Sequence, residues 1–350
     1  MWRVKTSKET RAVCRASERT IMKLFVYSLR EFDELQYFKK FAEKYNVEWD
    51  YTTEAPSPEN CHLAKGYDAI SILTTPTPAE MVDAMKENGV KVIATRTIGY
   101  DHIDVKHALE VGMGITNVSY SPASVADYTI MMMLIACRQI PFIVETAKVK
   151  DYSLKGKLGK ELSRATVGVI GTGRIGRTVI EHLSGFGCRI LANDIYPNES
   201  VKAYAEYVDL DTLYRECDII TLHAPALEDN YHMVDGESMA KMKDGVIIVN
   251  CARGQLIDTK ALVENLRNGK IGFAALDLVE DVEDIYYKDL RGEFMYHPQL
   301  DILSGFHNVF ITPHTAFYTE QAVSDMVENA IVGAEAYLKG EDHPYIVKKY

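Results

Sequence analysis

The sequence lacks both a long apolar run and any close pairing of its cysteines. Its longest apolar run lies around Ile130 to Cys137, far short of the roughly 20 residues that a transmembrane helix needs. No CxxC pair occurs, so neither a zinc site nor a disulfide framework is indicated by Cys14, Cys61, Cys137, Cys188, Cys217 and Cys251. We therefore expect no metal, no membrane partner and a cytoplasmic protein with reduced thiols.

Basic residues are outnumbered by acidic residues. The chain has 39 Lys and Arg against 50 Asp and Glu, a net charge of −11. This balance argues against a protein that grips nucleic acid phosphates or an anionic membrane. An anionic substrate would then need a local cationic site, which makes isolated loop arginines candidates. At 350 residues, the chain is long enough for two globular domains.

The first 21 residues depart from this acidic balance. They contain only two acidic residues, against the basic set Arg3, Lys5, Lys8, Arg11, Arg15 and Arg19. A transit peptide is conceivable, because the stretch is basic and acid-poor, but it lacks the apolar region of a secretory signal. We expect a disordered extension over residues 1–21, or a mis-assigned start with Met22 as the true first residue.

Short β-branched runs alternate with helical stretches, which is typical of parallel sheets covered by helices. The alternation occurs twice. The first series has a helix near Glu31–Tyr45 and strands expected at Lys23–Tyr27, Val47–Tyr51, Ala69–Leu73, Lys91–Thr95 and Gly114–Val118. This series predicts a first, smaller α/β domain.

The second series predicts a larger α/β domain. Its strands are expected at Thr166–Ile170, Arg189–Asn193, Ile219–Leu222, Val246–Asn250, Gly272–Leu276 and Val309–Ile311. A methionine-rich helix over Pro122–Gln139 precedes it, and its methionines favour core or interface packing over a cofactor pocket. Residues 280–303 predict an irregular acidic loop with some helix, and Thr319–Leu338 predicts one amphipathic helix.

The stretch that ends at Gly176 carries the pattern GxGxxG directly after a buried strand and at the start of a helix. Gly171 allows a tight turn, Gly173 lets the backbone approach a pyrophosphate, and Gly176 permits close packing of helix and strand. The helix start, at Arg174 and Ile175, offers N–H groups and a positive dipole end to phosphates. The alternative is a purely structural turn, but the strand and helix context favours a dinucleotide site.

Asp194 ends the next strand of this series. A carboxylate there would accept hydrogen bonds from the adenosine ribose and repel a 2′-phosphate, which predicts NAD rather than NADP. Further polar residues follow the remaining strands. In open parallel sheets ligands bind beyond the carboxyl ends of the strands, so we expect one cleft. Its residues would be Gly171–Gly176, Asp194, His223, Ala224, Pro225, Cys251, Ala252, Arg253, Asp277 and His314.

Two of these residues suit the reduction of a 2-oxo acid. That reaction needs a cation to hold the substrate carboxylate and polarise its carbonyl, and an acid to protonate the developing alkoxide. Arg253, followed by a glycine that permits a sharp turn, is always charged and can bind a carboxylate bidentately. His314 titrates in the range that a reversible acid and base requires. Taken singly, an arginine or histidine is more often structural.

The sequence resembles the D-isomer-specific 2-hydroxyacid dehydrogenases, and within them the D-lactate dehydrogenases, including the type that accompanies vancomycin resistance. The similarity covers nearly everything from Met22 onward. The segments that carry it are Val167–Gly176, Asn250–Asp258, Ala274–Asp277 and Thr312–Glu320.

The resemblance implies Arg253 as the substrate-binding and polarising residue and His314 as the proton donor. It implies Asp277 near the nicotinamide, and cofactor contacts at Cys251, Ala252, Ala224, Pro225 and Asn230. It also implies that backbone N–H groups of Ile98 and Gly99 hold the substrate carboxylate, and that Tyr120 lines the same pocket.

One position departs from the family pattern. The family usually places a glutamate five residues after the Asp277 equivalent, where it pairs with the histidine and raises its pKa. Here that position is Val282. Either the loop shifts so that Glu283 serves, or another carboxylate such as Glu280 reaches in, or His314 works unpaired.

The sequence thus predicts two doubly wound α/β domains. Residues 22–120 and 320–350 would form a flavodoxin-like substrate domain, and residues 121–319 a Rossmann domain that binds NAD. The expected activity is interconversion of a small 2-oxo acid, pyruvate first among them, and its D-2-hydroxy acid in a homodimeric enzyme. Phenylpyruvate, 2-oxoisocaproate, glyoxylate and hydroxypyruvate are rival substrates, and a non-catalytic NAD sensor of the same fold is the alternative.

Overall fold

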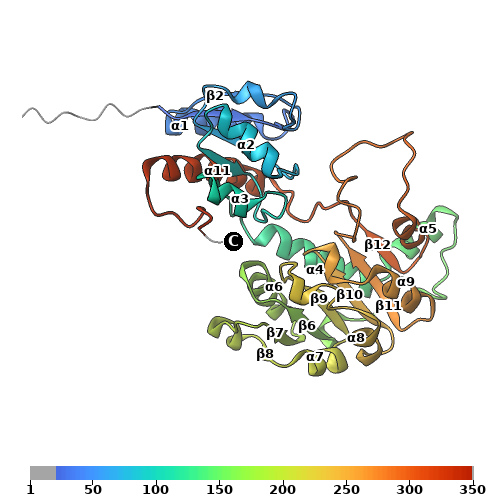
Figure 1. Ribbon diagram of the computed structural model, residues 1–350. Coiled ribbons are helices and arrows are strands. Elements are labelled where there is room, and N and C mark those ends of the chain that lie inside the picture. The colour runs from blue at the N-terminus through green and yellow to red at the C-terminus, as the bar shows by residue number, and fades with distance from the viewer. Residues whose placement is uncertain (1–20, 349–350) are drawn as a thin grey trace, which may run out of the picture. The chain divides into compact units, whose positions relative to one another are not determined.

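The computed structural model describes residues 21–348, and the chain divides into two compact units. Unit 1 draws its described residues from 1–120 and 323–350, and unit 2 comprises residues 121–322. Each unit is built around one parallel sheet (Figure 1). The extension expected over residues 1–21 lies outside the described residues, apart from Ile21.

Unit 1 contains a five-stranded sheet in the order β2-β1-β3-β4-β5. The strands are β1 Lys23–Val26, β2 Glu48–Tyr51, β3 Ala69–Ile72, β4 Val92–Thr95 and β5 Gly114–Thr116. This is the strand order of flavodoxin-like folds, as predicted. Its helices are α1 Leu35–Tyr45, α2 Ala79–Glu87, α3 Val105–Glu110 and most of α11 Glu320–Lys339, with a 3-10 turn η1 at Cys61–Ala64.

Strand β5 ends two residues earlier than the sequence indicates. The main chain of Asn117 turns away to donate a hydrogen bond to the carbonyl of Tyr345 near the C-terminus. An antiparallel bridge between Thr116 and Ile346 fixes the same contact. The C-terminal segment therefore caps the edge of this sheet, which no local sequence pattern indicates.

Unit 2 contains a seven-stranded sheet in the order β12-β11-β10-β9-β6-β7-β8 (Figure 1). The strands are β6 Thr166–Ile170, β7 Arg189–Asn193, β8 Glu206–Tyr207, β9 Ile219–Leu222, β10 Val246–Asn250, β11 Ile271–Leu276 and β12 Val309–Ile311. The order reverses beside β6, as in a Rossmann fold, and this confirms the predicted fold class. The two-residue strand β8 was missed because it is too short to show alternation.

The helices of unit 2 cover this sheet. They are α4 Ala123–Cys137, α5 Ile140–Lys148, α6 Arg174–Ser184, α7 Leu210–Glu216, α8 Gly236–Lys241, α9 Thr259–Arg267 and α10 Pro298–Ser304. Short 3-10 turns lie at η2 Leu162–Arg164, η3 Glu199–Ala203, η4 Glu228–Asn230 and η5 Gly254–Leu256. All five residues of β10 are buried, because this strand is covered on both faces. Its sequence is therefore a continuous apolar run and not an alternation of apolar and polar residues.

Helix α4 is apolar on nearly all sides and buries most of its surface within unit 2, although Met131 and Leu134 are exposed. It packs against α6, β10 and β11, and Met132 and Met133 are fully buried. Gln139 adopts the left-handed conformation, with φ +51°, and this ends the helix before α5 begins. Among the described residues, no single helix is long and apolar enough to cross a membrane; α4 and α5 pass that test only as a pair bent by 60°.

Candidate active site

The glycine-rich turn between β6 and α6 combines close contacts at its ends with open space in its middle. Gly171 has φ +92°, and a Cβ there would lie 2.7 Å from the amide nitrogen of Ala224. A Cβ on Gly176 would lie 1.9 Å from the carbonyl oxygen of Gly171, so only glycine lets α6 approach this closely. A Cβ on Gly173 would meet nothing within 4 Å. The turn therefore leaves room for a ligand at Gly173.

Helix α6 presents its N-terminal end at this opening. It begins at Arg174, has Gly173 as its N-cap, and no side chain caps its first N–H groups. Arg174 is exposed and Ile175 is half-buried. Such N–H groups, together with the positive end of the helix dipole, fit the pyrophosphate of a dinucleotide.

Asp194 lies beside the same turn, as predicted, and is bound to it. Its Oδ2 accepts hydrogen bonds from the backbone N–H of Thr172 (2.5 Å) and from the Thr172 hydroxyl (2.9 Å). The Thr172 hydroxyl also lies 2.8 Å from the Tyr207 hydroxyl. Thr172 lies within the glycine pattern, but sequence reasoning gave it no role, and it missed Tyr207, which lies outside the pattern.

The segment after β9 is packed against the glycine turn. His223 is half-buried, and burial lowers the pKa of its ring to about 3, so it is neutral at pH 7. Its Nε2 lies 3.0 Å from the hydroxyl of Thr221. Farther along, the Asn230 side-chain amide donates to the carbonyl of Pro225 (2.7 Å), and its oxygen accepts from the amide of Leu227 (2.7 Å). Asn230 therefore folds this loop on itself.

Arg253 lies in the turn that follows β10. Asn250 shapes this turn, because its side-chain amide donates to the Arg253 carbonyl (2.8 Å) and its oxygen accepts from the Ala252 amide (3.0 Å). Gly254 is needed next, since a Cβ there would lie 2.4 Å from the Val279 carbonyl. Cys251 is buried, and burial raises the pKa of its thiol to about 12, so it is no nucleophile.

Asp277 ends β11 and organises the next turn of the site. Its carboxylate is fully buried and accepts hydrogen bonds from the Thr312 hydroxyl (2.6 Å), the Thr315 amide (2.8 Å) and the Ala316 amide (3.0 Å). Burial raises the pKa of Asp277, and these hydrogen bonds oppose the rise. Asp277 therefore holds the loop that carries His314.

His314 is half-buried among three aromatic side chains, and its backbone has the left-handed conformation, with φ +54°. Ring centroids lie 5.4 Å away for Tyr286, 5.6 Å for Tyr287 and 5.7 Å for Phe317. Burial, and secondly the positive charge of Arg253, lower the pKa of His314 to about 4.

The site segments of unit 2 meet at one edge of its sheet. The glycine turn, Asp194, His223, Arg253, Asp277 and His314 follow β6, β7, β9, β10, β11 and β12. These strands are parallel neighbours, so their carboxyl ends lie at the same edge. Within residues 21–348, no group of three His, Cys, Asp or Glu side chains could hold a metal ion.

In unit 1, Arg96 follows β4 but is no ligand-binding cation. Arg96 and Glu34 are both fully buried, and their side chains pair at 3.0 Å. Arg96 also donates to the Ser71 hydroxyl and to the carbonyl of Tyr27. Burial lowers the pKa of Arg96, and Glu34 opposes the shift. The pair anchors the start of the loop that contains Ile98 and Gly99.

The loop after β4 is fixed through its carbonyl groups. The Gly99 carbonyl accepts from the Thr97 hydroxyl (2.6 Å), and the Ile98 carbonyl accepts from the Asn117 amide (2.8 Å). Among residues 21–348, the N–H groups of Ile98 and Gly99 have no protein acceptor. They fit the expected role as donors to an anion. Tyr120, also predicted here, is half-buried and is the last residue before unit 2.

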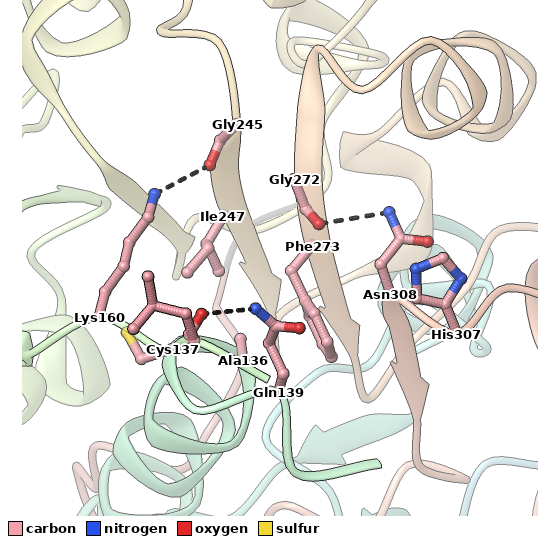
Figure 2. A pocket seen from close by; sticks show the side chains of 11 residues that line it. Ala136, Cys137, Gln139, Lys160, Gly245, Ile247, Gly272, Phe273, His307 and Asn308 are labelled. Atoms are coloured by element: carbon pink, nitrogen blue, oxygen red, sulfur yellow. Dashed lines mark hydrogen bonds between the residues drawn. The ribbon is translucent and has the colours of Figure 1, made fainter. Parts of the chain in front are cut away.

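A cavity of about 280 Å³ lies at the opposite edge of the unit 2 sheet (Figure 2). Gly245 and Asn308, which line it, precede β10 and β12. Its polar groups bond to the backbone: Lys160 to the Gly245 carbonyl (3.3 Å), Gln139 to the Leu158 carbonyl (2.9 Å) and Asn308 to the Gly272 carbonyl (3.3 Å). This cavity is therefore separate from the residues described above.

Comparison with known proteins gives relatives over nearly the whole chain. An aromatic 2-oxoacid reductase of Clostridium sporogenes is 47% identical over 91% of this chain and 97% of its own length. A D-lactate dehydrogenase of Lactiplantibacillus plantarum is 41% identical over 87% of this chain and 93% of its own length. The crystal structure of a D-lactate dehydrogenase from Treponema pallidum matches with TM-score 0.86 and 34% identity, over 94% of this chain and all of that chain.

A family model described as the NAD-binding domain of D-isomer specific 2-hydroxyacid dehydrogenases matches residues 130–316. The chain belongs to this family. The family resemblance, the NAD cofactor and the oxidoreductase class inferred from the sequence are thereby confirmed. The open space at Gly173 and the uncapped start of α6 agree with that cofactor.

This member of the D-isomer specific 2-hydroxyacid dehydrogenases does not pair Glu283 with His314. Glu283 instead accepts a hydrogen bond from the side chain of Gln255 (3.0 Å). The loop turns at Asp281, which has φ +58°, and packs Val282 into the core of unit 2, so Glu283 points elsewhere. Of the three alternatives that the sequence leaves open, the shift of Glu283 into the family's glutamate position is not the one found.

Glu280, the other carboxylate considered, is also engaged elsewhere. It is buried, and its Oε1 lies 2.5 Å from Nε2 of His232 and 2.9 Å from the Tyr231 hydroxyl. The His314 side chain has a different partner, because its Nδ1 lies 2.8 Å from the Tyr287 hydroxyl. Sequence reasoning missed Tyr287, which stands in the irregular acidic stretch where no periodic pattern marks it.

Proposed function

We propose that this enzyme reduces a 2-oxo acid with an aromatic side chain to the D-2-hydroxy acid, and catalyses the reverse reaction. The observation that carries the proposal is that Arg253 and His314 follow β10 and β12, at the carboxyl ends of the same parallel strands as the glycine turn. A cation and a proton donor are the two groups that carbonyl reduction requires beside a hydride source.

In this proposal Arg253 binds the substrate carboxylate and polarises the adjacent carbonyl. Bound NADH supplies the hydride, and His314 donates a proton to the carbonyl oxygen as negative charge develops there. Asp277 acts through His314 by holding its loop. The N–H groups of Ile98 and Gly99 provide further donors to the carboxylate, and Tyr120 lines the pocket.

The same proposal assigns the cofactor contacts. The N–H groups at Gly173, Arg174 and Ile175 hold the pyrophosphate. Asp194 accepts hydrogen bonds from the adenosine ribose, and the loop residues Ala224, Pro225 and Asn230, with Cys251 and Ala252, border the cofactor. Asp277 lies near the nicotinamide.

An aromatic substrate is favoured over pyruvate by the surroundings of His314. Tyr286, Tyr287 and Phe317 lie within 6 Å of its ring by centroid distance, and Tyr287 is 49% exposed. Exposed aromatic rings offer edge-to-face or offset contacts to a second aromatic group. The relative that is 47% identical is named an aromatic 2-oxoacid reductase. Pyruvate remains the second candidate, because relatives at 41% and 37% identity are D-lactate dehydrogenases.

A substrate panel tests this proposal. NADH oxidation is measured with phenylpyruvate, 2-oxoisocaproate, pyruvate, glyoxylate and hydroxypyruvate, for the wild type and His314→Ala. His307→Ala, at the cavity on the opposite sheet edge, is the matched histidine control. We expect the highest kcat/KM with phenylpyruvate and its loss only in His314→Ala. Preference for pyruvate would replace the substrate assignment, and NADH binding without any reduction would support an NAD sensor instead.

We also propose a homodimer formed through the α4–α5 region. Helix α5 has apolar residues but none that is buried, and Val144 is 47% exposed. The following segment exposes Val149, Tyr152 and Leu154 by 77% or more. Exposed apolar patches of this kind mark protein interfaces. Sedimentation of wild type and Leu154→Glu tests this: a wild-type monomer would contradict it.

A cytoplasmic location is the last element of the proposal. Cys61, Cys137, Cys188, Cys217 and Cys251 are all without disulfides. Unpaired thiols suit a reducing compartment. Cell fractionation that recovers the protein outside the cytoplasm would contradict this placement.

A further inference from the structure

The His314 imidazole has a phenol as its side-chain partner where the family pattern places a carboxylate. Nδ1 of His314 lies 2.8 Å from the Tyr287 hydroxyl, and both residues belong to unit 2. We propose that Tyr287 is the positioning residue for His314: its hydroxyl oxygen accepts the Nδ1–H hydrogen bond and thereby leaves Nε2 to exchange the catalytic proton. This inference rests on the function proposed above and deepens it.

Glu280 and Glu283, two glutamates of the neighbouring acidic loop, are bound to other side chains. The position expected to carry the glutamate is Val282, which is 3% exposed and belongs to the core of unit 2. Glu283 is bound to Gln255, and Glu280 is bound to His232. The Tyr287 hydroxyl is therefore the group that occupies the partner position.

The backbone around this hydrogen bond is held in uncommon conformations. His314 has φ +54° and Tyr287 has φ +66°, and both are non-glycine residues in the left-handed region. Such conformations are costly, persist only where the surroundings enforce them, and cluster at functional sites. The surroundings here are the Asp277 carbonyl, which accepts from the His314 amide (2.9 Å), and the ring of Phe317. The imidazole is thus oriented from several sides.

The hydrogen bond selects one tautomer of the imidazole. If Nδ1 keeps its proton and donates it in a hydrogen bond to the Tyr287 oxygen, the second proton of the imidazolium is on Nε2. Nε2 gives this proton to the substrate oxygen as the hydride adds to the carbonyl carbon. The neutral imidazole then regains a proton on Nε2 from solvent. Tyr287 keeps its own proton throughout, so the balance of one hydride and one proton is complete.

A phenol differs from a carboxylate in its effect on charge. It orients the ring, yet it adds no negative charge to stabilise the imidazolium. The charged or titratable groups that face His314 from the packed elements are Arg253, Asp277, Tyr286 and Tyr287. Burial and Arg253 dominate, and they lower the pKa of His314. Removal of the Tyr287 hydroxyl should therefore alter orientation and tautomer more than the pH at which His314 protonates.

The test compares Tyr287→Phe with Tyr51→Phe, a tyrosine of unit 1 whose hydroxyl donates a hydrogen bond to Glu31 (2.7 Å). With phenylpyruvate or the best substrate of the panel, we expect Tyr287→Phe to lower kcat about 10- to 100-fold, as misplacement of a catalytic group does. KM for the 2-oxo acid and Kd for NADH should change less than about threefold. Tyr51→Phe should match the wild type.

Nitrogen-15 NMR of His314 gives a second readout that does not depend on turnover. We expect the Nδ1–H tautomer at neutral pH in the wild type and a mixture of tautomers in Tyr287→Phe. A wild type dominated by the Nε2–H tautomer, or a Tyr287→Phe variant with unchanged kcat and tautomer, would overturn the inference while the proposed function stands. If no 2-oxo acid is reduced, the proposed function fails, and the tautomer still decides whether Tyr287 orients the ring.

Discussion

The amide of His314 donates to the main-chain carbonyl of Asp277 at 2.9 Å, and the carboxylate of Asp277 binds the residues that follow His314. One buried residue thus fixes the loop on both sides of His314, the proposed proton donor. The end of β11 and the end of β12 are joined in this way, because the two strands are neighbours in the sheet. These contacts set the backbone position of His314, whereas the orientation of its ring depends on its side-chain contacts.

Asp277→Asn should loosen this loop. Asparagine has the same shape as aspartate, but only one of its two terminal atoms is an oxygen that accepts hydrogen bonds. One of the three groups that donate to the Asp277 carboxylate therefore loses its acceptor. We expect kcat to fall about tenfold or more and the free energy of unfolding to fall by about 1–3 kcal/mol. Activity and thermal unfolding are measured beside Asp289→Asn, an exposed control. Wild-type activity in Asp277→Asn would show that the loop is held by other contacts.

The pH dependence of reduction should reflect the lowered pKa of His314. The folded pKa is about 4, below the ordinary value of about 6.5, so the folded enzyme loses the imidazolium early as pH rises. We expect kcat/KM for reduction to decline with pH through the neutral range. A profile that stays level to well above pH ~8 would contradict this reading. Arg253→Gln should raise the His314 pKa, which NMR titration measures.

The same shift has a consequence for stability. Between pH ~4 and ~6.5 the unfolded chain binds the proton that folded His314 excludes, so His314 makes stability rise with pH across that window. His314→Ala should flatten this part of the profile, as followed by denaturant unfolding. An unchanged slope would show that other groups dominate it.

Glu34→Gln should destabilise unit 1, because it leaves the buried Arg96 guanidinium without its counter-charge. Breaking a buried pair in this way costs about 3–5 kcal/mol. The matched control is Glu48→Gln, which breaks an exposed pair with Lys23 and should leave the unfolding free energy nearly unchanged. Denaturant titration compares the two variants. Equal, small effects would mean that Arg96 finds other acceptors.

Asp194→Ser should weaken the preference for NADH over NADPH. The change removes the carboxylate that, in the proposed site, would repel a 2′-phosphate, and it also removes the acceptor for the Thr172 amide. We expect KM for NADH to rise about tenfold and the NADH to NADPH ratio of kcat/KM to fall. Asp211→Asn, on the surface of α7, is the control. An unchanged ratio of kcat/KM with NADH to kcat/KM with NADPH would contradict the assignment of Asp194 to the ribose site.

Much of this architecture could be predicted, because parallel strands buried on both faces appear as apolar runs. The β10 run and the glycine pattern after β6 are examples, and their order along the chain fixed the edge where Arg253 and His314 meet. The glycine positions are marked locally, since only glycine fits at Gly171 and Gly176.

The partner of His314 could not be predicted, because it depends on the path of an irregular loop. The sequence left open whether Glu280, Glu283 or neither pairs with His314. The outcome depends on the left-handed conformation of Asp281 and on the burial of Val282. Neither the conformation of Asp281 nor the burial of Val282 is indicated by a periodic pattern in the sequence. The Tyr287 hydroxyl is brought to His314 from 27 residues away by tertiary structure alone.

The most direct test of the account is single-turnover reduction of phenylpyruvate by NADH, in the wild type and in His314→Gln. Glutamine retains polarity and approximate size but cannot donate a proton as an acid. We expect hydride transfer to slow about 10²- to 10⁴-fold, with D-phenyllactate as the wild-type product and unchanged NADH affinity. Wild-type transfer rates in His314→Gln would contradict the assignment of His314 as the proton donor.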